Sequence, residues 1–253
     1  MKPKPYFLKI SFIIILFISL ANRNHAVAQN NLRSITELTA DTSGLEILNN
    51  AIKIARNKFE ILPADEAKAK EALYQTQVTT RSPMGAIIYF TGGILIDNGW
   101  IRILGSGSDK LTRSLPGWNK GKTFNDYGEQ PKFLLIADDA VGGFFAVNGG
   151  AFGTDLGKIY YLAPDRLKWE AQNITYTEFI NFCFVGDMNQ YYDDLRWPEW
   201  QKDMPQMTAD KGFYIYPFLW TTEGKDILKD KRSIVPIGEL YTLETDAIKQ
   251  LSK

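Results

Sequence analysis

Histidine and cysteine are almost absent from this chain. Its 253 residues include one histidine, His25, and one cysteine, Cys183. A single cysteine cannot form an internal disulfide, and a thiol with no histidine to activate it is a poor nucleophile. Cys183 stands between Phe182 and Phe184 in an apolar stretch, so we expect a buried small side chain. The scarcity of imidazole also removes the commonest general acid–base and metal-ligating group.

Residues 1–28 predict a cleaved export signal. Lysines precede an apolar run over residues 10–21, and polar residues then lead to the small-x-small triplet Ala26-Val27-Ala28. These are the three parts of a Sec signal peptide. The run is short for a transmembrane helix, which needs about 20 apolar residues. We therefore expect a periplasmic or secreted protein with no stable membrane anchor after processing, and a mature chain that lacks His25.

Neither sign of charge dominates the composition. The chain has 29 basic and 29 acidic residues; four basic and no acidic ones lie in residues 1–28, so residues 29–253 carry 25 basic and 29 acidic residues, a net charge of −4. Nucleic-acid binding requires a basic face, so we expect no nucleic-acid partner. The sequence also contains no phosphate-binding loop and no dinucleotide fingerprint. We expect no cofactor and no bound metal.

What is present is an alternation of helical and β-rich segments. Helical spacing predicts helices at residues 44–59, 63–76, 176–185 and 187–195 and after Pro236. Short β-rich runs predict strands at 85–90, 94–97, 100–104, 132–137, 144–147, 158–162 and 213–216. Residues 29–44 are expected to be a loose lead-in, and residues 105–131 a long irregular segment. This order predicts a single α+β domain over residues 29–253, with a mainly antiparallel sheet covered by helices.

Several uncommon strings accompany this pattern: QVTTRSPMGA (77–86), WIRILGSG (100–107), ADDAVGGFFAVNGGA (137–151), YYLAPD (160–165), LRWP (195–198) and YPFLWT (216–221). With them, about residues 33–250 resemble the bacterial family called domain of unknown function 2625. That family has no established activity, so the resemblance implies no catalytic residue and no cofactor. A fainter likeness, carried by the Asp-Asp turn, the Gly-Gly before an aromatic strand and the Tyr-Tyr strand, is to the SMI1/KNR4-like superfamily, many of whose members are immunity proteins that bind toxins.

The candidate binding residues are charged or aromatic side chains at predicted turns and helix ends: Arg81, Trp118, Asp138, Asp139, Arg196 and Trp197. Guanidinium groups at such corners either tie loops to buried carboxylates or clamp an anionic ligand, and the two aspartates are the expected internal partners. Aspartates at a strand end can ligate cations but more often form turns. Tryptophans are enriched at interfaces and also fill cores. No catalytic residue can be named from these patterns.

The mature chain lacks imidazole, a reactive-looking thiol, a phosphate-binding loop and a cluster of metal ligands. These absences favour a non-enzymatic binding or interaction module with a protein or glycan partner. We expect its contact surface to comprise residues 105–131, the 138–143 turn and the 195–200 corner. Two alternatives stay open. One is a hydrolase of extracellular glycan-like polymers, which would need two facing carboxyl groups with different pKa values. The other is an immunity-type protein that binds a toxin.

Overall fold

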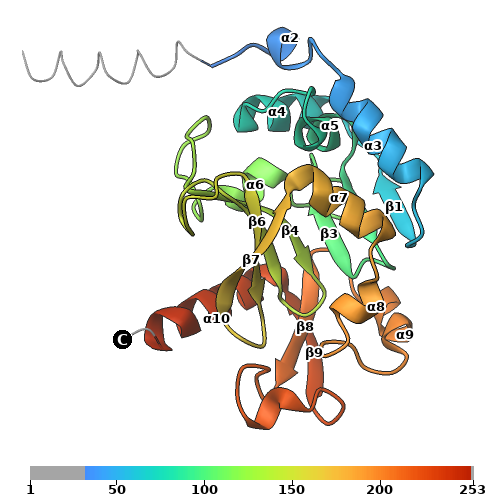
Figure 1. The fold of residues 1–253 in the computed structure, drawn as a ribbon, viewed down its shortest axis with the longest axis vertical. Helices are drawn as coiled ribbons and strands as arrows, with labels where there is room; N and C mark the ends of the chain where they lie inside the picture. Colours follow the sequence, from blue (N-terminus) through green and yellow to red (C-terminus); the bar gives the residue numbers. More distant parts are fainter. Residues whose placement is uncertain (1–31, 252–253) are drawn as a thin grey trace, which may run out of the picture.

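The chain folds around a seven-stranded antiparallel sheet (Figure 1). The computed structural model describes residues 32–251, so the predicted signal peptide and His25 lie outside the described residues. Neighbours in the sheet are also neighbours in the chain: β1 (Phe59–Leu62), β2 (Gly93–Ile96), β3 (Ile101–Leu104), β4 (Phe133–Asp139), β5 (Phe144–Asn148), β6 (Lys158–Ala163) and β7 (Lys168–Thr175). The sheet is therefore a meander, with β1 and β7 at its edges.

Helices cover both faces of this sheet. The helices of the described range are α2 (Ile35–Leu38), α3 (Ser43–Lys53), α4 (Glu66–Thr76), α5 (Pro83–Phe90), α6 (Leu115–Asn119), α7 (Tyr176–Val185), α8 (Met188–Tyr191), α9 (Trp200–Asp203) and α10 (Ile237–Leu251). Successive residues of a strand point to opposite faces. Phe145 packs on Phe179 of α7 at a ring-centroid distance of 4.9 Å, while Phe144 packs on Tyr241 of α10 at 5.0 Å and Trp118 of α6 at 6.4 Å. Hence α7 lies on one face, and α6 and α10 lie on the other.

A second, two-stranded antiparallel sheet extends the face that carries α10. It consists of β8 (Lys211–Tyr216) and β9 (Lys231–Pro236), and it projects at the bottom of Figure 1. The backbone N–H of Phe213 donates to the Ala140 carbonyl at 2.7 Å, which ties β8 to the β4–β5 turn. Short 3₁₀ turns, η1 (Met204–Gln206) and η2 (Glu223–Lys225), lie on either side of β8 in the chain. The predicted α+β class with a mainly antiparallel sheet is confirmed.

The predicted strand at residues 85–90 is wrong, because these residues form most of helix α5. The Ser82 side chain accepts a hydrogen bond from the Gly85 N–H at 3.1 Å, and Pro83 occupies the first turn. Both are helix-start features. The apolar run from Ala86 to Ile88 is buried all round, so its sequence carries no 3.6-residue period that would distinguish it from a buried strand.

Three strands, β1, β7 and β9, are not predicted by the sequence patterns. β1 begins at Phe59, the last residue of the predicted helix 44–59, whose actual counterpart α3 ends at Lys53. β7 and β9 are polar strands at sheet edges. Within the predicted lead-in, α2 begins with a capping box between Ser34 and Glu37. In the described range, no helix combines the length and apolarity needed to cross a bilayer.

Candidate functional site

Most of the predicted site residues lie inside the protein. Trp118, Asp138, Asp139 and Trp197 are buried, and the Arg196 side chain is only 6% exposed. Arg81 alone is at the surface, where its side chain is 78% exposed and its Nε lies 3.8 Å from Asp41 Oδ2. The six residues therefore do not form one shared surface, and each buried one has to be understood through its internal partners.

Asp138 is the centre of a buried group of charges. Its Oδ1 lies 2.8 Å from Arg102 Nε, which is an ion pair without hydrogen-bond alignment, and its Oδ2 lies 2.5 Å from Arg113 Nη1. Arg113 in turn places Nε 3.0 Å from Asp210 Oδ1. Asp138 and Arg102 are fully buried, and Asp210 is the most exposed member. Two acids thus balance two arginines, and the group joins β3, β4 and the segment before β8.

Trp118 belongs to the same cluster through Arg113. The Arg113 guanidinium carbon lies 4.6 Å from the centre of the Trp118 ring, and Lys122 Nζ lies 4.0 Å from it. Trp118 is buried and also stacks on Phe144. The structure therefore brings Trp118 and Asp138 together through Arg113, as parts of the interior.

Asp139 closes the β4–β5 turn. Its Oδ1 accepts hydrogen bonds from the backbone N–H groups of Val141 at 3.0 Å and Gly143 at 2.8 Å, and its Oδ2 accepts one from the Tyr161 hydroxyl at 2.6 Å. Burial raises the pKa of Asp139 above its usual value, although these three donors oppose that shift. The carboxylate is fully used as a turn former.

Arg196 is enclosed by aromatic rings. Its guanidinium carbon lies 4.1 Å from the ring centre of Trp200, 4.6 Å from that of Trp100 and 5.2 Å from that of Tyr192. Nη2 lies 2.6 Å from Asp97 Oδ2, in the turn between β2 and β3. Arg196 therefore ties that turn to the segment before α9, and the expectation that it pairs with Asp138 or Asp139 is wrong.

Trp197, next in the chain, faces the small sheet. Its Nε1–H donates to Asp203 at 2.7 Å, its ring meets Phe213 at 5.0 Å, and the Arg232 guanidinium covers it at 4.5 Å. It is thus a packing residue between the main body and β8–β9.

The partners Arg102, Arg113 and Asp210 were missed in the sequence. One signal was present, because Arg102 interrupts the strand Ile101-Arg102-Ile103-Leu104, where an unpaired charge would be too costly to bury. A lone arginine in such a run predicts a buried acid opposite, and Asp138 is its register partner.

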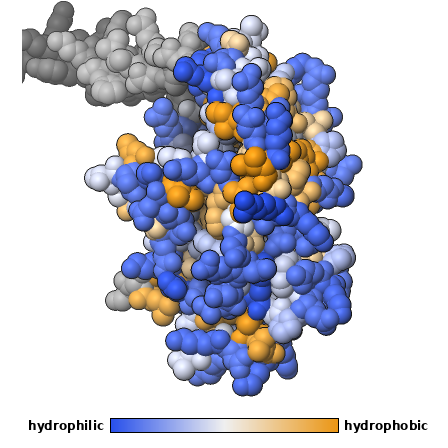
Figure 2. Space-filling view, turned by 45° about the vertical axis from the view of Figure 1, so that its right-hand side comes forward, coloured by the Kyte–Doolittle hydropathy of each residue, from blue (hydrophilic) through white to orange (hydrophobic). Residues whose placement is uncertain are grey.

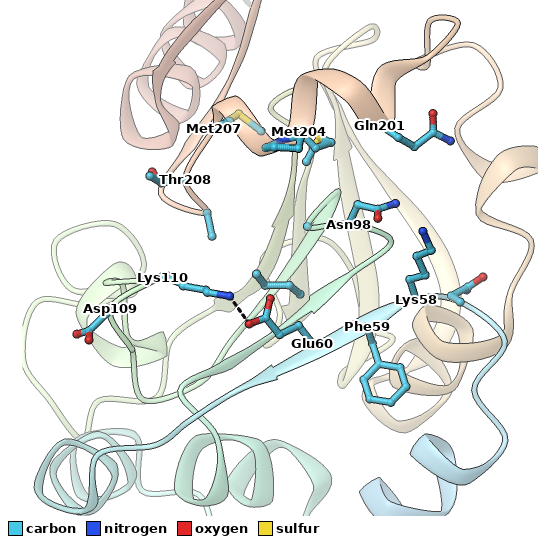
Figure 3. A pocket seen from close by; sticks show the side chains of 15 residues that line it. Lys58, Phe59, Glu60, Asn98, Asp109, Lys110, Gln201, Met204, Met207 and Thr208 are labelled. Carbon is cyan, nitrogen blue, oxygen red and sulfur yellow. Dashed lines mark hydrogen bonds and ion pairs between the residues drawn. The ribbon is translucent and has the colours of Figure 1, made fainter.

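An open groove of about 810 Å³ lies beside β1 (Figure 3). Glu60 pairs across the sheet with Leu95, and Leu95 pairs with Arg102, so the groove lies on the same face as the buried charges. Its walls come from well-separated parts of the chain: residues 57–60, 95, 98–99, 109–110, 201, 204–205 and 207–209.

Side chains of opposite charge and several amides line this groove. Lys110 forms an ion pair with Glu60 across its floor, and Met204 and Met207 stand on the opposite wall (Figure 3). The Phe59 ring points away from the groove and packs on Phe184 at 5.2 Å. The groove therefore offers hydrogen-bond donors, acceptors and polarisable sulfur within a single concave surface.

A second hollow of about 480 Å³ continues the groove towards α7 and α8. Asn57, Lys58, Asn98 and Gln201 line both. Asn57 Nδ2 donates to the carbonyls of Cys183 and Gly186, both at 2.9 Å, which fixes this end of the groove to the carboxyl end of α7. The Asp97 carboxylate, held by Arg196, borders the same hollow.

Within the part of the chain that the structure describes, no cysteine or histidine lines the groove. Cys183 is buried, as expected, and burial raises the pKa of its thiol far above the usual value. Among residues 32–251, no three His, Cys, Asp or Glu side chains are grouped closely enough to hold a metal ion. The groove lining offers charged side chains and amides that can form hydrogen bonds.

The surface on the side of β1 and α3 is mostly hydrophilic, and hydrophobic residues are grouped in its upper part (Figure 2). The exposed apolar side chains of these elements include Ile47 of α3, Ile54 directly after it, and Phe59 and Ile61 of β1. The segment just before β1 is tied to α7, because the Phe184 carbonyl accepts hydrogen bonds from the N–H groups of Arg56 and Asn57.

Comparisons with known proteins give consistent matches. A family model described as "Protein of unknown function DUF2625" matches residues 35–240. An uncharacterized protein of Haemophilus influenzae is 44% identical over 202 residues, which cover 79% of this chain and 88% of that protein. The putative uncharacterized protein YbfG of Escherichia coli K12 is 39% identical over 214 residues, 84% of this chain and 96% of YbfG.

Proposed function

The chain belongs to the family of proteins of unknown function DUF2625, and we propose that it is a non-enzymatic module that binds a polypeptide partner in the groove beside β1. The observation that carries the proposal is the groove's lining, which combines charges of both signs, amides and methionines on a fixed support. Ligand sites commonly combine a concave shape with a few well-placed polar groups.

The character of the lining favours a polypeptide over a uniformly charged polymer. Lys58 and Lys110 attract acidic groups, Glu60 and Asp109 attract basic ones, and the amides of Asn98 and Gln201 can donate to and accept from a main chain. Methionine side chains adapt to varied apolar surfaces. One expected contact region contributes to the groove, since Asp109 and Lys110 come from the 105–131 segment; Gln201 lies one residue beyond the 195–200 corner.

Site-specific photo-crosslinking tests this proposal. Benzoylphenylalanine placed at the exposed Gln201 should yield a discrete polypeptide adduct in cells of the natural host, whereas the same group at the exposed Leu156, on the β5–β6 loop, should not. Lys58→Glu should reduce the Gln201 adduct, and Lys168→Glu, at the opposite edge of the sheet, should leave it unchanged. Equal adducts at both positions, or no effect of Lys58→Glu, would refute groove binding, and a carbohydrate adduct would identify a glycan partner instead.

We also propose that residues 1–28 direct export and are then removed. The lysine-rich start, the short apolar run and the Ala26-Val27-Ala28 triplet support this. Amino-terminal sequencing of the protein from fractionated cells should find residue 29 first, in the envelope or culture fraction. Intact Met1 on cytosolic protein would contradict the proposal.

A carboxylate-dependent hydrolase is the second candidate, favoured by one hollow of about 550 Å³ that contains Asp203 and Asp230. Burial, together with the charge of Asp226, raises the pKa of Asp230. Its Oδ2 has no hydrogen-bond partner, while Asp203 accepts from Trp197. Glycoside hydrolysis uses two carboxyl groups whose surroundings move their pKa values apart.

This candidate is tested by assaying release of reducing ends from envelope glycans. Activity that Asp230→Asn abolishes and that Asp226→Asn retains would support it. Absence of turnover in the folded wild-type protein, or activity that survives in Asp230→Asn, would eliminate this pair of acids.

A further inference from the structure

A small hollow lies between α10, the β4–β5 turn and the loop that joins β8 to β9. It holds about 20 Å³, and its lining includes Val141, Phe218, Trp220, Leu243 and Glu244. The hollow shares no lining residue with the groove beside β1. A space of this size admits one group as large as a water molecule.

Glu244 is the one charged side chain in this apolar lining. It is 2% exposed, and its Oε2 has no hydrogen-bond partner. The β4–β5 turn packs directly on the carboxyl group, since a Cβ added at Gly142 would lie 2.6 Å from Oε1. The carboxyl group is therefore fixed in place but left without a compensating cation or donor at Oε2.

The two other buried acids nearby show what Glu244 lacks. Asp138 is paired with two arginines, and Asp139 accepts three hydrogen bonds. Burial, and then the negative charge of Asp139, raise the pKa of Glu244 well above its usual value. A positive group in the hollow would oppose this rise in the pKa of Glu244, because an adjacent cation favours the ionised carboxylate.

The rim of the hollow is aromatic. Phe218 and Trp220 stack with their ring centres 4.4 Å apart and their planes 7° apart, and Tyr214 meets Phe218 edge-on at 5.7 Å. Aromatic faces attract cations and also cover aliphatic chains. The lining thus combines a deep acid with a rim suited to an alkyl chain that ends in a positive charge.

We propose that this hollow binds a primary alkylammonium group, with Glu244 as its counter-ion and the Phe218–Trp220 stack against its alkyl stem. An –NH₃⁺ head is as small as the space, and it carries three donors for the carboxylate. A quaternary ammonium head is too large to enter. The hollow and the groove share no lining residue, so either binding proposal can be refuted without affecting the other.

An NMR titration of the purified protein at pH 8 tests the site. A primary amine is cationic at this pH, because its usual pKa is about 10.4. The reporter is the indole N–H signal of Trp220, assigned by its loss in Trp220→Phe. n-Butylammonium chloride, added at constant total chloride, should shift this signal saturably, and tetramethylammonium chloride should not.

Variants on α10 separate the carboxyl group from general effects. Glu244→Gln keeps the shape and should weaken n-butylammonium binding about tenfold or more, as expected for loss of a charge-assisted pair. Leu243→Phe should block the hollow and abolish the saturable shift. Glu239→Gln, at an exposed position of the same helix, should bind as the wild type does.

The proposal fails if the folded wild-type protein shows no saturable shift, if Glu244→Gln binds n-butylammonium equally well, or if tetramethylammonium binds as tightly. A further titration with Nα-acetyl-lysine N-methylamide distinguishes the source of the ammonium group. Binding at least as tight as that of n-butylammonium supports a lysine side chain of a polypeptide, and weaker binding supports a small free amine.

Discussion

An Asp138→Asn substitution keeps the shape of the side chain but removes the negative charge between two guanidinium groups. Arg102 then loses its paired acid at a fully buried position, while Arg113 retains Asp210. Removing one partner of a buried ion pair costs about 3–5 kcal/mol, because the remaining charge is left uncompensated. For a domain of this size each kcal/mol lowers the melting temperature by about 2–4 °C, so we expect a decrease of about 6–20 °C.

Urea denaturation followed by circular dichroism measures the change in unfolding free energy. Asp246→Asn is the matched control, since Asp246 forms an exposed ion pair with Lys249 on α10 and should contribute at most about 1 kcal/mol. The double variant Arg102→Met/Asp138→Leu should recover much of the loss, because well-packed apolar residues can replace a buried pair. A loss for Asp138→Asn within about 1 kcal/mol of that for Asp246→Asn would refute the reasoning.

Two further substitutions test the β4–β5 turn and its neighbour on α10. The folded protein retains the Glu244 proton over a pH range in which the unfolded chain has released it. The contribution of Glu244 to wild-type stability should therefore be full below the usual glutamate pKa and should decline as pH rises towards the raised pKa of the folded state. Urea midpoints measured from pH 5 to 9 should show that Glu244→Gln lacks this decline, and parallel curves for the two proteins would contradict the prediction. Gly143→Ala should lower the free energy of unfolding by roughly 1–3 kcal/mol, because the added Cβ would lie 2.1 Å from the Tyr161 hydroxyl and 2.2 Å from Asp139 Oδ2. A melting temperature equal to that of the wild type would contradict this prediction and show that the turn relaxes freely.

The sheet was predictable where short-range chemistry decides the structure. Asn98-Gly99 forms the β2–β3 turn, with positive φ at both residues, as such turns require. Asp139 forms the next turn through its own backbone, as aspartates at strand ends commonly do. The α5 segment was mistaken because burial on all sides removes the periodicity on which the prediction depends.

The groove could not be predicted from the sequence, because its walls lie far apart in the chain. Lys58, Lys110 and Gln201 meet only after the meander and the segment before β8 have packed. The binding roles of the six predicted residues stay predictions. For Arg196 the sequence predicted a guanidinium group that ties a loop to a carboxylate. It could not identify the partner, because Asp97 is 99 residues away in the chain.

Pairing in chain order shapes how this protein can fold. The β2–β3, β4–β5, β5–β6 and β6–β7 connections are hairpins, and closing a short loop costs little entropy. Each of these pairs can therefore form without waiting for more distant parts of the chain. The contact between Arg102 and the Lys211 carbonyl spans 109 positions, so Arg102 must wait for the last fifth of the polypeptide before its polar partners are complete.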